Sequence, residues 1–121
     1  MPGVKVFLDS NTILYMHDRR DAAKGERVVA WLRAISQMRA ACINLQVLNE
    51  VTSVMLRKKW YPAPAIVYRI VDDLAEFGSD PLTRVEVEAA RLIHARHGYS
   101  WWDSLLLASA LELGCTYFLS E

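Results

Sequence analysis

The sequence has no excess of charge of either sign and no long apolar run. Its 121 residues hold 14 Lys and Arg against 14 Asp and Glu, so the formal net charge is zero. The chain is therefore not a bulk polycation, and any nucleic-acid binding must use local basic patches. No apolar run approaches the roughly 18 residues that a membrane span needs, and no signal peptide is visible. We therefore expect a cytoplasmic protein without a membrane partner.

Cysteine is also scarce. Cys42 and Cys115 lie in apolar segments without the spacing of a metal site, which favours buried free thiols in a reducing compartment over a disulfide. The three histidines share no ligand spacing either. Repeats, low-complexity tracts and linkers rich in glycine or serine are missing. The length and the apolar fraction of 53% fit one domain with its own core.

The pattern of apolar residues predicts strands that alternate with helices. Short apolar runs at 4–8, 40–43 and 116–119 are typical of buried strands, and a brief extended piece lies near Leu82. The segments that we predict to be helical are 12–16, 22–39, 45–59, 65–77, 83–98 and 100–114. This order implies an α/β fold in which a parallel central sheet of about four strands is covered by helices on both faces. Such sheets bind ligands beyond the carboxyl ends of their strands.

Several acidic residues lie at or just beyond these strand ends. Asp9 ends the first strand, Glu50 lies about a turn and a half into the helix after the second, and Asp103 lies in the first turn of the last helix. Ser120 and Glu121 end the last strand. Carboxylates gathered at one sheet edge repel each other, and a hard cation such as Mg²⁺ or Mn²⁺ relieves that repulsion. Such an ion can activate water and stabilise the charge that develops on a phosphodiester.

Asp9 has a structural alternative, because an acid at that place can cap the following helix. Ser10 and Asn11 can cap the same helix, however, so three capping residues exceed what one helix start needs. A phosphoacceptor of the receiver type would need a second acid beside Asp9 and a later lysine. Asp9 has no acidic neighbour, and no lysine follows Lys59, which argues against that class.

Asp103 and Glu50 also have alternatives. Asp103 can form a capping box with Ser100, yet it shares a helical face with Leu106 that we expect to point at the sheet, where an unpaired carboxylate is costly. Glu50 can form a surface ion pair with Arg57, and the two interpretations of Glu50 stay open.

One basic patch mixes cations with aromatic rings. Arg57, Lys58 and Lys59 are followed by Trp60 and Tyr61, as in many surfaces that bind nucleic-acid strands. Cations also suit the end of a helix for its own reasons, so this patch is the weaker part of the pattern. We predict the three cations as substrate-binding residues.

The stretches LDSNTIL (8–14), INLQVLNEV (43–51) and YSWWDSLLLASALELGCTYFLSE (99–121) together resemble a PIN domain, most closely the VapC-type toxins of toxin–antitoxin pairs. The resemblance covers essentially the whole chain. It implies a small endoribonuclease, dependent on Mg²⁺ or Mn²⁺, that acts on structured RNA such as transfer or ribosomal RNA. It further implies a homodimer, silenced by a cognate antitoxin whose tail lies in a groove near the active site.

The resemblance also assigns roles to individual residues. Asp9 and Asp103 match metal ligands of the family, and Glu50 matches the middle acid of the same cluster. Ser120 matches a hydroxyl residue that supports the site, and Asn11 one that orients nearby groups. The catalytic set implied in this way is Asp9, Glu50 and Asp103.

The chain departs from the family pattern at its end. Another Asp usually lies two residues after the position of Ser120, but this sequence ends at Glu121. We therefore expect one PIN-like domain, residues 1–121, that lacks the family's C-terminal helix and edge strand. A catalytically impaired PIN-fold module, serving as an RNA- or protein-binding domain, is the alternative to an active ribonuclease.

Overall fold

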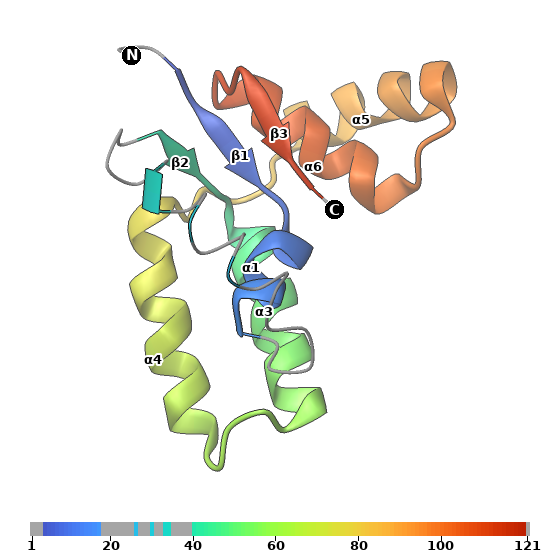
Figure 1. Ribbon diagram of the computed structural model, residues 1–121. Helices are drawn as coiled ribbons and strands as arrows, with labels where there is room; N and C mark the ends of the chain where they lie inside the picture. Colours follow the sequence, from blue (N-terminus) through green and yellow to red (C-terminus); the bar gives the residue numbers. More distant parts are fainter. Residues whose placement is uncertain (1–3, 18–25, 27–29, 31–32, 35–39, 121) are drawn as a thin grey trace.

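The computed structural model describes residues 4–17, 26, 30, 33–34 and 40–120 (Figure 1). The predicted helix 22–39 lies for the most part outside these residues, and so does Glu121. The elements are β1 (Val6–Leu8), α1 (Ser10–His17), β2 (Ala41–Cys42), α3 (Leu45–Lys58), α4 (Pro64–Leu74), the 3₁₀ turn η1 (Ala75–Phe77), α5 (Arg84–His97), α6 (Trp101–Glu112) and β3 (Tyr117–Leu119). Within the described segments no helix is long and apolar enough to cross a membrane.

The sheet is parallel and has the strand order β2-β1-β3, so the first strand lies in the middle. Val6 pairs with both Ala41 and Tyr117, which sets the register on each side. A central strand is covered on both faces, and this explains why the first apolar run has no polar alternation. Phe7 is fully buried and stacks on Phe118 of β3, with ring centroids 5.5 Å apart.

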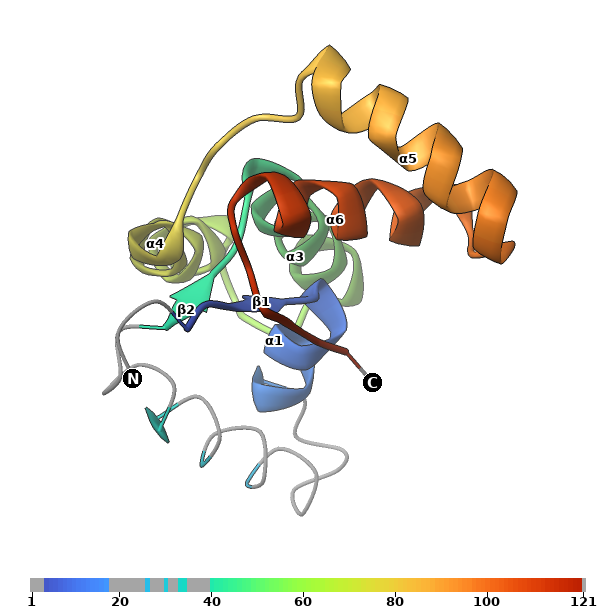
Figure 2. The same cartoon turned by 90° about the horizontal axis from the view of Figure 1, so that it is seen from above.

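Helices cover both faces of this sheet, as the sequence predicts. Figure 2 shows α5 and α6 on one side of the strands and α1 on the other. The helices α3 and α4 form a contacting pair that extends past the carboxyl ends of the strands (Figure 1). The α/β/α arrangement is thus confirmed, but the described residues form three strands rather than about four. The piece near Leu82 is extended without strand pairing.

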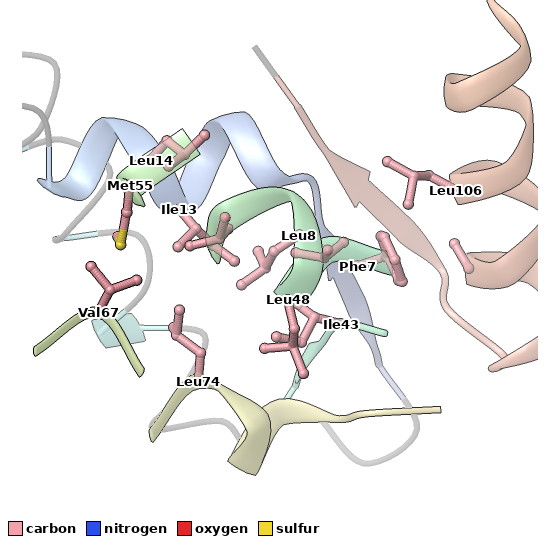
Figure 3. Packing of buried hydrophobic residues seen from close by; sticks show 13 residues of the cluster. Phe7, Leu8, Ile13, Leu14, Ile43, Leu48, Met55, Val67, Leu74 and Leu106 are labelled. Atoms are coloured by element: carbon pink, nitrogen blue, oxygen red, sulfur yellow. The ribbon is translucent and has the colours of Figure 1, made fainter. Parts of the chain in front are cut away.

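The main core lies where β1 meets α1, α3 and α4. Figure 3 shows Leu8 among Ile13, Ile43 and Leu48, while Leu106 of α6 approaches Phe7 from the far side of β1. The periodic face of the predicted helix 65–77 packs here through Val67 and Leu74. A second, smaller cluster joins α5 to α6.

Asn44 fixes the start of α3 and connects it to α6. Its side-chain oxygen accepts a hydrogen bond from the Val47 N–H at 3.0 Å, which caps the helix. Its amide nitrogen donates to Ser109 Oγ at 2.8 Å, and the Asn44 side chain is fully buried. The start of α3, and with it the acid that this helix carries, is therefore held both by its own cap and by a hydrogen bond to α6.

The turn after η1 approaches the end of β2 very closely. Gly78 has φ +139°, and a Cβ there would lie 2.3 Å from the Ile43 carbonyl oxygen. The Leu45 N–H donates to the Asp80 carbonyl at 2.9 Å, so the loop after Gly78 is held against the start of α3. Glycine is required here because any other side chain would meet backbone.

The two thiols are free, as the sequence predicts, although each is only half-buried. Desolvation by burial, followed by the neighbouring Cys42 thiol, raises the pKa of Cys115 to about 12. Lys5 partly opposes this shift. Cys115 is therefore a neutral packing group at physiological pH.

Candidate active site

The ends of β1 and β3 bring Asp9 and Ser120 together from opposite ends of the chain. The Asp9 N–H donates to the Leu119 carbonyl at 3.0 Å, and the Thr12 hydroxyl donates to the same oxygen at 3.1 Å. Ser120 Oγ then donates to Asp9 Oδ2 at 2.7 Å. The predicted meeting of the first and last strands at one carboxyl edge is confirmed for these two residues.

The Asp9 side chain does not serve as a simple helix cap. Its backbone carbonyl accepts from the N–H groups of Thr12 and Ile13, at 3.1 and 3.4 Å, as the first helical bonds of α1. Its carboxylate accepts instead from the Ser120 hydroxyl at one oxygen, and its other oxygen lies within hydrogen-bond distance of the Ser10 hydroxyl. Asp9 is only 5% exposed, so its carboxyl group is held at this edge with both oxygens oriented.

Ser10 connects Asp9 to Glu50. Its hydroxyl oxygen lies 3.2 Å from Asp9 Oδ1 and 2.7 Å from Glu50 Oε2, and it has one proton to donate. Both carboxylates contact one oxygen, so they lie within about 6 Å of each other, a range in which like charges repel. Gln46, one turn before Glu50, donates from Nε2 to Glu50 Oε1 at 2.9 Å. Two acids from separate elements thus share one hydrogen-bonded network.

Asp103 lies apart from this network. It is exposed in the first turn of α6, and its N–H donates to Ser100 Oγ at 3.1 Å, as the capping alternative requires. Leu106, three positions later on the same helical face, is buried as predicted, and so is Ala110, whereas Leu107 is only partly buried. The helical period therefore identifies the buried face of α6, but the first turn of α6, which carries Asp103, lies outside the buried part of that face. The described residues contain no group of three His, Cys, Asp or Glu side chains placed to hold a metal ion.

A second set of predicted residues meets in a separate pocket of about 260 Å³. Asn11 and Tyr15 of α1 line it from one side, and Arg57, Lys58 and Trp60 line it from the other. The Lys58 ammonium lies 5.7 Å from the Trp60 ring centroid. Neither Arg57 nor Lys58 makes an ion pair with another described residue, so the surface alternative of a Glu50–Arg57 pair is not what the structure forms.

The oxygen atoms around Asp9 suit a hard divalent cation. Two carboxylates and two serine hydroxyls offer only oxygen, which is the ligand that Mg²⁺ and Mn²⁺ prefer. Mg²⁺ is commonly held by one or two carboxylates, with waters and substrate phosphates completing its shell. The pair of Asp9 and Glu50 meets that requirement without a third acid.

Two residues of the network were not among the predicted site residues. The sequence indicates only a capping role for Ser10, because its bridging role depends on the packing of α1 against α3, which the sequence does not show. Gln46 lies four positions before Glu50 on one helix, and that spacing is a signal that can be read from the sequence. Its carbonyl oxygen is buried without a hydrogen-bond partner among the described groups.

The chain belongs to the PIN domain family, whose model matches residues 6–121. Its structure is similar to the crystal structure of VapC20 from Mycobacterium tuberculosis, a toxin that cleaves the sarcin–ricin loop. The TM-score is 0.71, and the match covers 97% of this chain and 89% of that chain at 20% sequence identity. At that identity the likeness concerns the fold. No curated protein sequence matches the chain significantly.

Proposed function

We propose that the protein is a divalent-metal-dependent endoribonuclease, the toxin of a VapBC-type toxin–antitoxin pair. The observation that carries the proposal is the network of Asp9, Ser10 and Glu50, closed by Ser120, at the carboxyl edge of a PIN-domain sheet. The fold of VapC20, an RNA-cleaving toxin, supports structured RNA as the substrate class.

Asp9 and Glu50 would hold the ion, with Asp103 approaching from the first turn of α6. Bound there, Mg²⁺ or Mn²⁺ would supply activation of water for in-line attack on phosphorus and stabilisation of the developing charge. The hydroxyls of Ser10 and Ser120 would keep the carboxylates oriented, as outer partners of metal ligands do. Asn11 would orient groups on the exposed side of α1.

The basic pocket would hold the RNA backbone beside this centre. Arg57 and Lys58 lie on the same helix as Glu50, two turns further on, and no described carboxylate neutralises them. Phosphate is a suitable anion for two such cations, and Trp60 offers a stacking surface. Lys59, which is exposed and has φ +52° at the end of α3, would add charge at the rim.

Partners follow from the same proposal. Exposed apolar side chains on α5 and α6, namely Val85, Leu92 and Leu111, offer a surface for a second copy of the chain. We expect a homodimer, measurable by light scattering, and a cognate antitoxin that blocks the site. The cytoplasm, where the RNA lies, is the expected location.

The test is RNA cleavage by the full chain. Purified protein is incubated with total RNA in Mg²⁺ or Mn²⁺, and the products are mapped by sequencing. Asp9→Asn and Glu50→Gln should reduce cleavage at least a hundredfold. Asp72→Asn, an exposed acid on α4, serves as the matched control and should retain wild-type cleavage.

The alternative is a PIN-fold module without catalysis that binds RNA or protein. The exposed position of Asp103, outside the network, is the observation that favours it. Wild-type protein that binds RNA but leaves it intact in both metals would support this alternative. Cleavage that persists in Asp9→Asn would exclude the proposed centre altogether.

A further inference from the structure

A groove of about 670 Å³ opens beside the acidic network and shares two residues with it, Gln46 and Glu50. One wall is the first half of α3, with Leu45, Gln46, Asn49, Glu50 and Ser53. The opposite wall is made by Pro81 and Leu82 from the loop before α5 and by Trp102 from α6. Trp102 is 63% exposed, so an indole face is presented to whatever enters.

The walls of this groove are held in place before any ligand binds. The hydrogen bond from the Leu45 N–H to the Asp80 carbonyl fixes the loop against α3. The bond from Asn44 to Ser109 fixes α6 relative to the same helix end. A preformed site costs little conformational entropy on binding.

The lining indicates a flat, uncharged group with polar edges. Among the described residues that line the groove, Glu50 alone is charged, and Arg57 and Lys58 line the separate pocket toward the other end of α3. A phosphate would therefore be repelled from the groove and attracted to that pocket. A nucleobase fits what remains, since Trp102 offers a stacking face and the exposed carboxamide of Asn49 can both donate and accept.

We propose that the groove is a nucleobase subsite, in which the base of a nucleotide next to the cleaved phosphodiester stacks on Trp102 and presents its edge to Asn49. The inference rests on the proposed ribonuclease function. It adds Trp102 and Asn49 as residues that determine which nucleotide is accepted, because Glu50 borders both the groove and the acidic network.

The experiment uses a short RNA that spans a cleavage site mapped with the wild-type protein. Each nucleotide in turn is replaced by an abasic one, and kcat/KM is measured for wild type and Trp102→Ala. In wild type, one abasic position should lower kcat/KM by roughly 5- to 150-fold, the range for loss of one stacked base. In Trp102→Ala the same abasic position should cost little more, because the base has already lost its partner.

Three further variants make the result specific. Trp102→Phe keeps an aromatic face and should retain most of the discrimination, whereas Trp102→Leu keeps only apolar volume and should lose it. Asn49→Ala should flatten the preference among the four bases at that one position. Tyr68→Ala removes another exposed aromatic ring, from α4, and should leave the whole scan unchanged.

If Trp102→Ala cleaved every RNA as fast as the wild-type protein does, the inference would be overturned while the ribonuclease function stands. The inference would also be overturned if Trp102→Ala lowered kcat/KM by the same factor for every RNA of the scan, because that result would indicate a purely structural role for Trp102. Full activity and full discrimination by Trp102→Leu would show that no aromatic face is needed in the groove, and this would overturn the inference as well. Failure of the wild-type protein to cleave any RNA would appear before any variant is compared, and it would remove the proposed function and the inference together.

Discussion

Replacing Ser10 with alanine tests the link between the two acids directly. The substitution deletes the hydroxyl that lies 2.7 Å from Glu50 Oε2 and 3.2 Å from Asp9 Oδ1, and it leaves the backbone of α1 unchanged. Ser10 is only 6% exposed, so water has limited access to replace the lost donor. The carboxylates of Asp9 and Glu50 would then face each other without the hydroxyl that lies between them.

The expected loss can be worked out from this geometry. A hydrogen bond to a charged group contributes about 1.5–3 kcal/mol. Water would not fully replace the lost donor at this nearly buried site. In a domain of this size, this loss of free energy corresponds to a melting temperature lower by about 5–10 °C. Mg²⁺ should recover part of the difference, because a bound cation neutralises the same pair of acids.

The assay is thermal unfolding monitored by circular dichroism, measured at Mg²⁺ concentrations that differ by a factor of ten. Ser53→Ala removes an exposed hydroxyl from α3 and should stay within about 0.5 kcal/mol of wild type. A melting temperature of Ser10→Ala equal to that of the control would refute the account of the hydroxyl as a bridge. If Mg²⁺ did not raise the lowered melting temperature of Ser10→Ala, the stabilising role of the Ser10 hydroxyl would be independent of the proposed metal.

Three further outcomes are expected. Asp103→Asn should leave the free energy of unfolding within about 0.5 kcal/mol, since the side chain is exposed, and should lower RNA cleavage about tenfold or more; unchanged cleavage would exclude Asp103 as a ligand. Gly78→Ala should lower the free energy of unfolding by about 2–4 kcal/mol in denaturant titration, because its Cβ would meet the Ile43 carbonyl at φ +139°, and a change below about 0.5 kcal/mol would contradict the close approach. Cys115, whose pKa is raised to about 12 mainly by burial, should react with iodoacetamide at pH 8 much more slowly than an ordinary thiol until the protein unfolds. The raised pKa keeps the folded thiol neutral, so the contribution of Cys115 to stability is complete below pH 9 and falls as the pH rises toward 12. Equal labelling of Cys115 in folded and unfolded protein, measured by mass spectrometry, would contradict the raised pKa.

The sequence predicts most of the fold because its apolar periods are clear. The all-apolar run at 4–8 indicates a strand covered on both faces, and β1 is indeed the central strand. In the described part of the chain, the predicted helix ends lie within a few residues of the observed ones, as for the helix expected at 45–59 and found at Leu45–Lys58. The piece near Leu82 forms no strand, because Leu82 packs against the small cluster between α5 and α6 and the nearby Asp80 carbonyl is bonded to the start of α3.

The site is only partly predictable from the sequence, for a physical reason. Parallel topology brings the ends of β1 and β3 to one edge, so the contact of Asp9 with Ser120 could be expected from element order alone. Helical periodicity places Asp103 on the face of Leu106, but it does not say how far along the helix that face stays buried. The bridge through Ser10 depends on how α1 packs on α3, and this is decided by tertiary contacts.

Calorimetric titration of Mn²⁺ tests the central claim most directly, because it measures ion binding without RNA. Wild-type protein should bind Mn²⁺ with defined stoichiometry, and Asp9→Asn and Glu50→Gln should each weaken binding at least tenfold. The control Asp72→Asn, which removes an exposed acid from α4, should match wild type. Equal binding by Asp9→Asn and wild type would contradict the claim that the Asp9–Glu50 network is the metal centre.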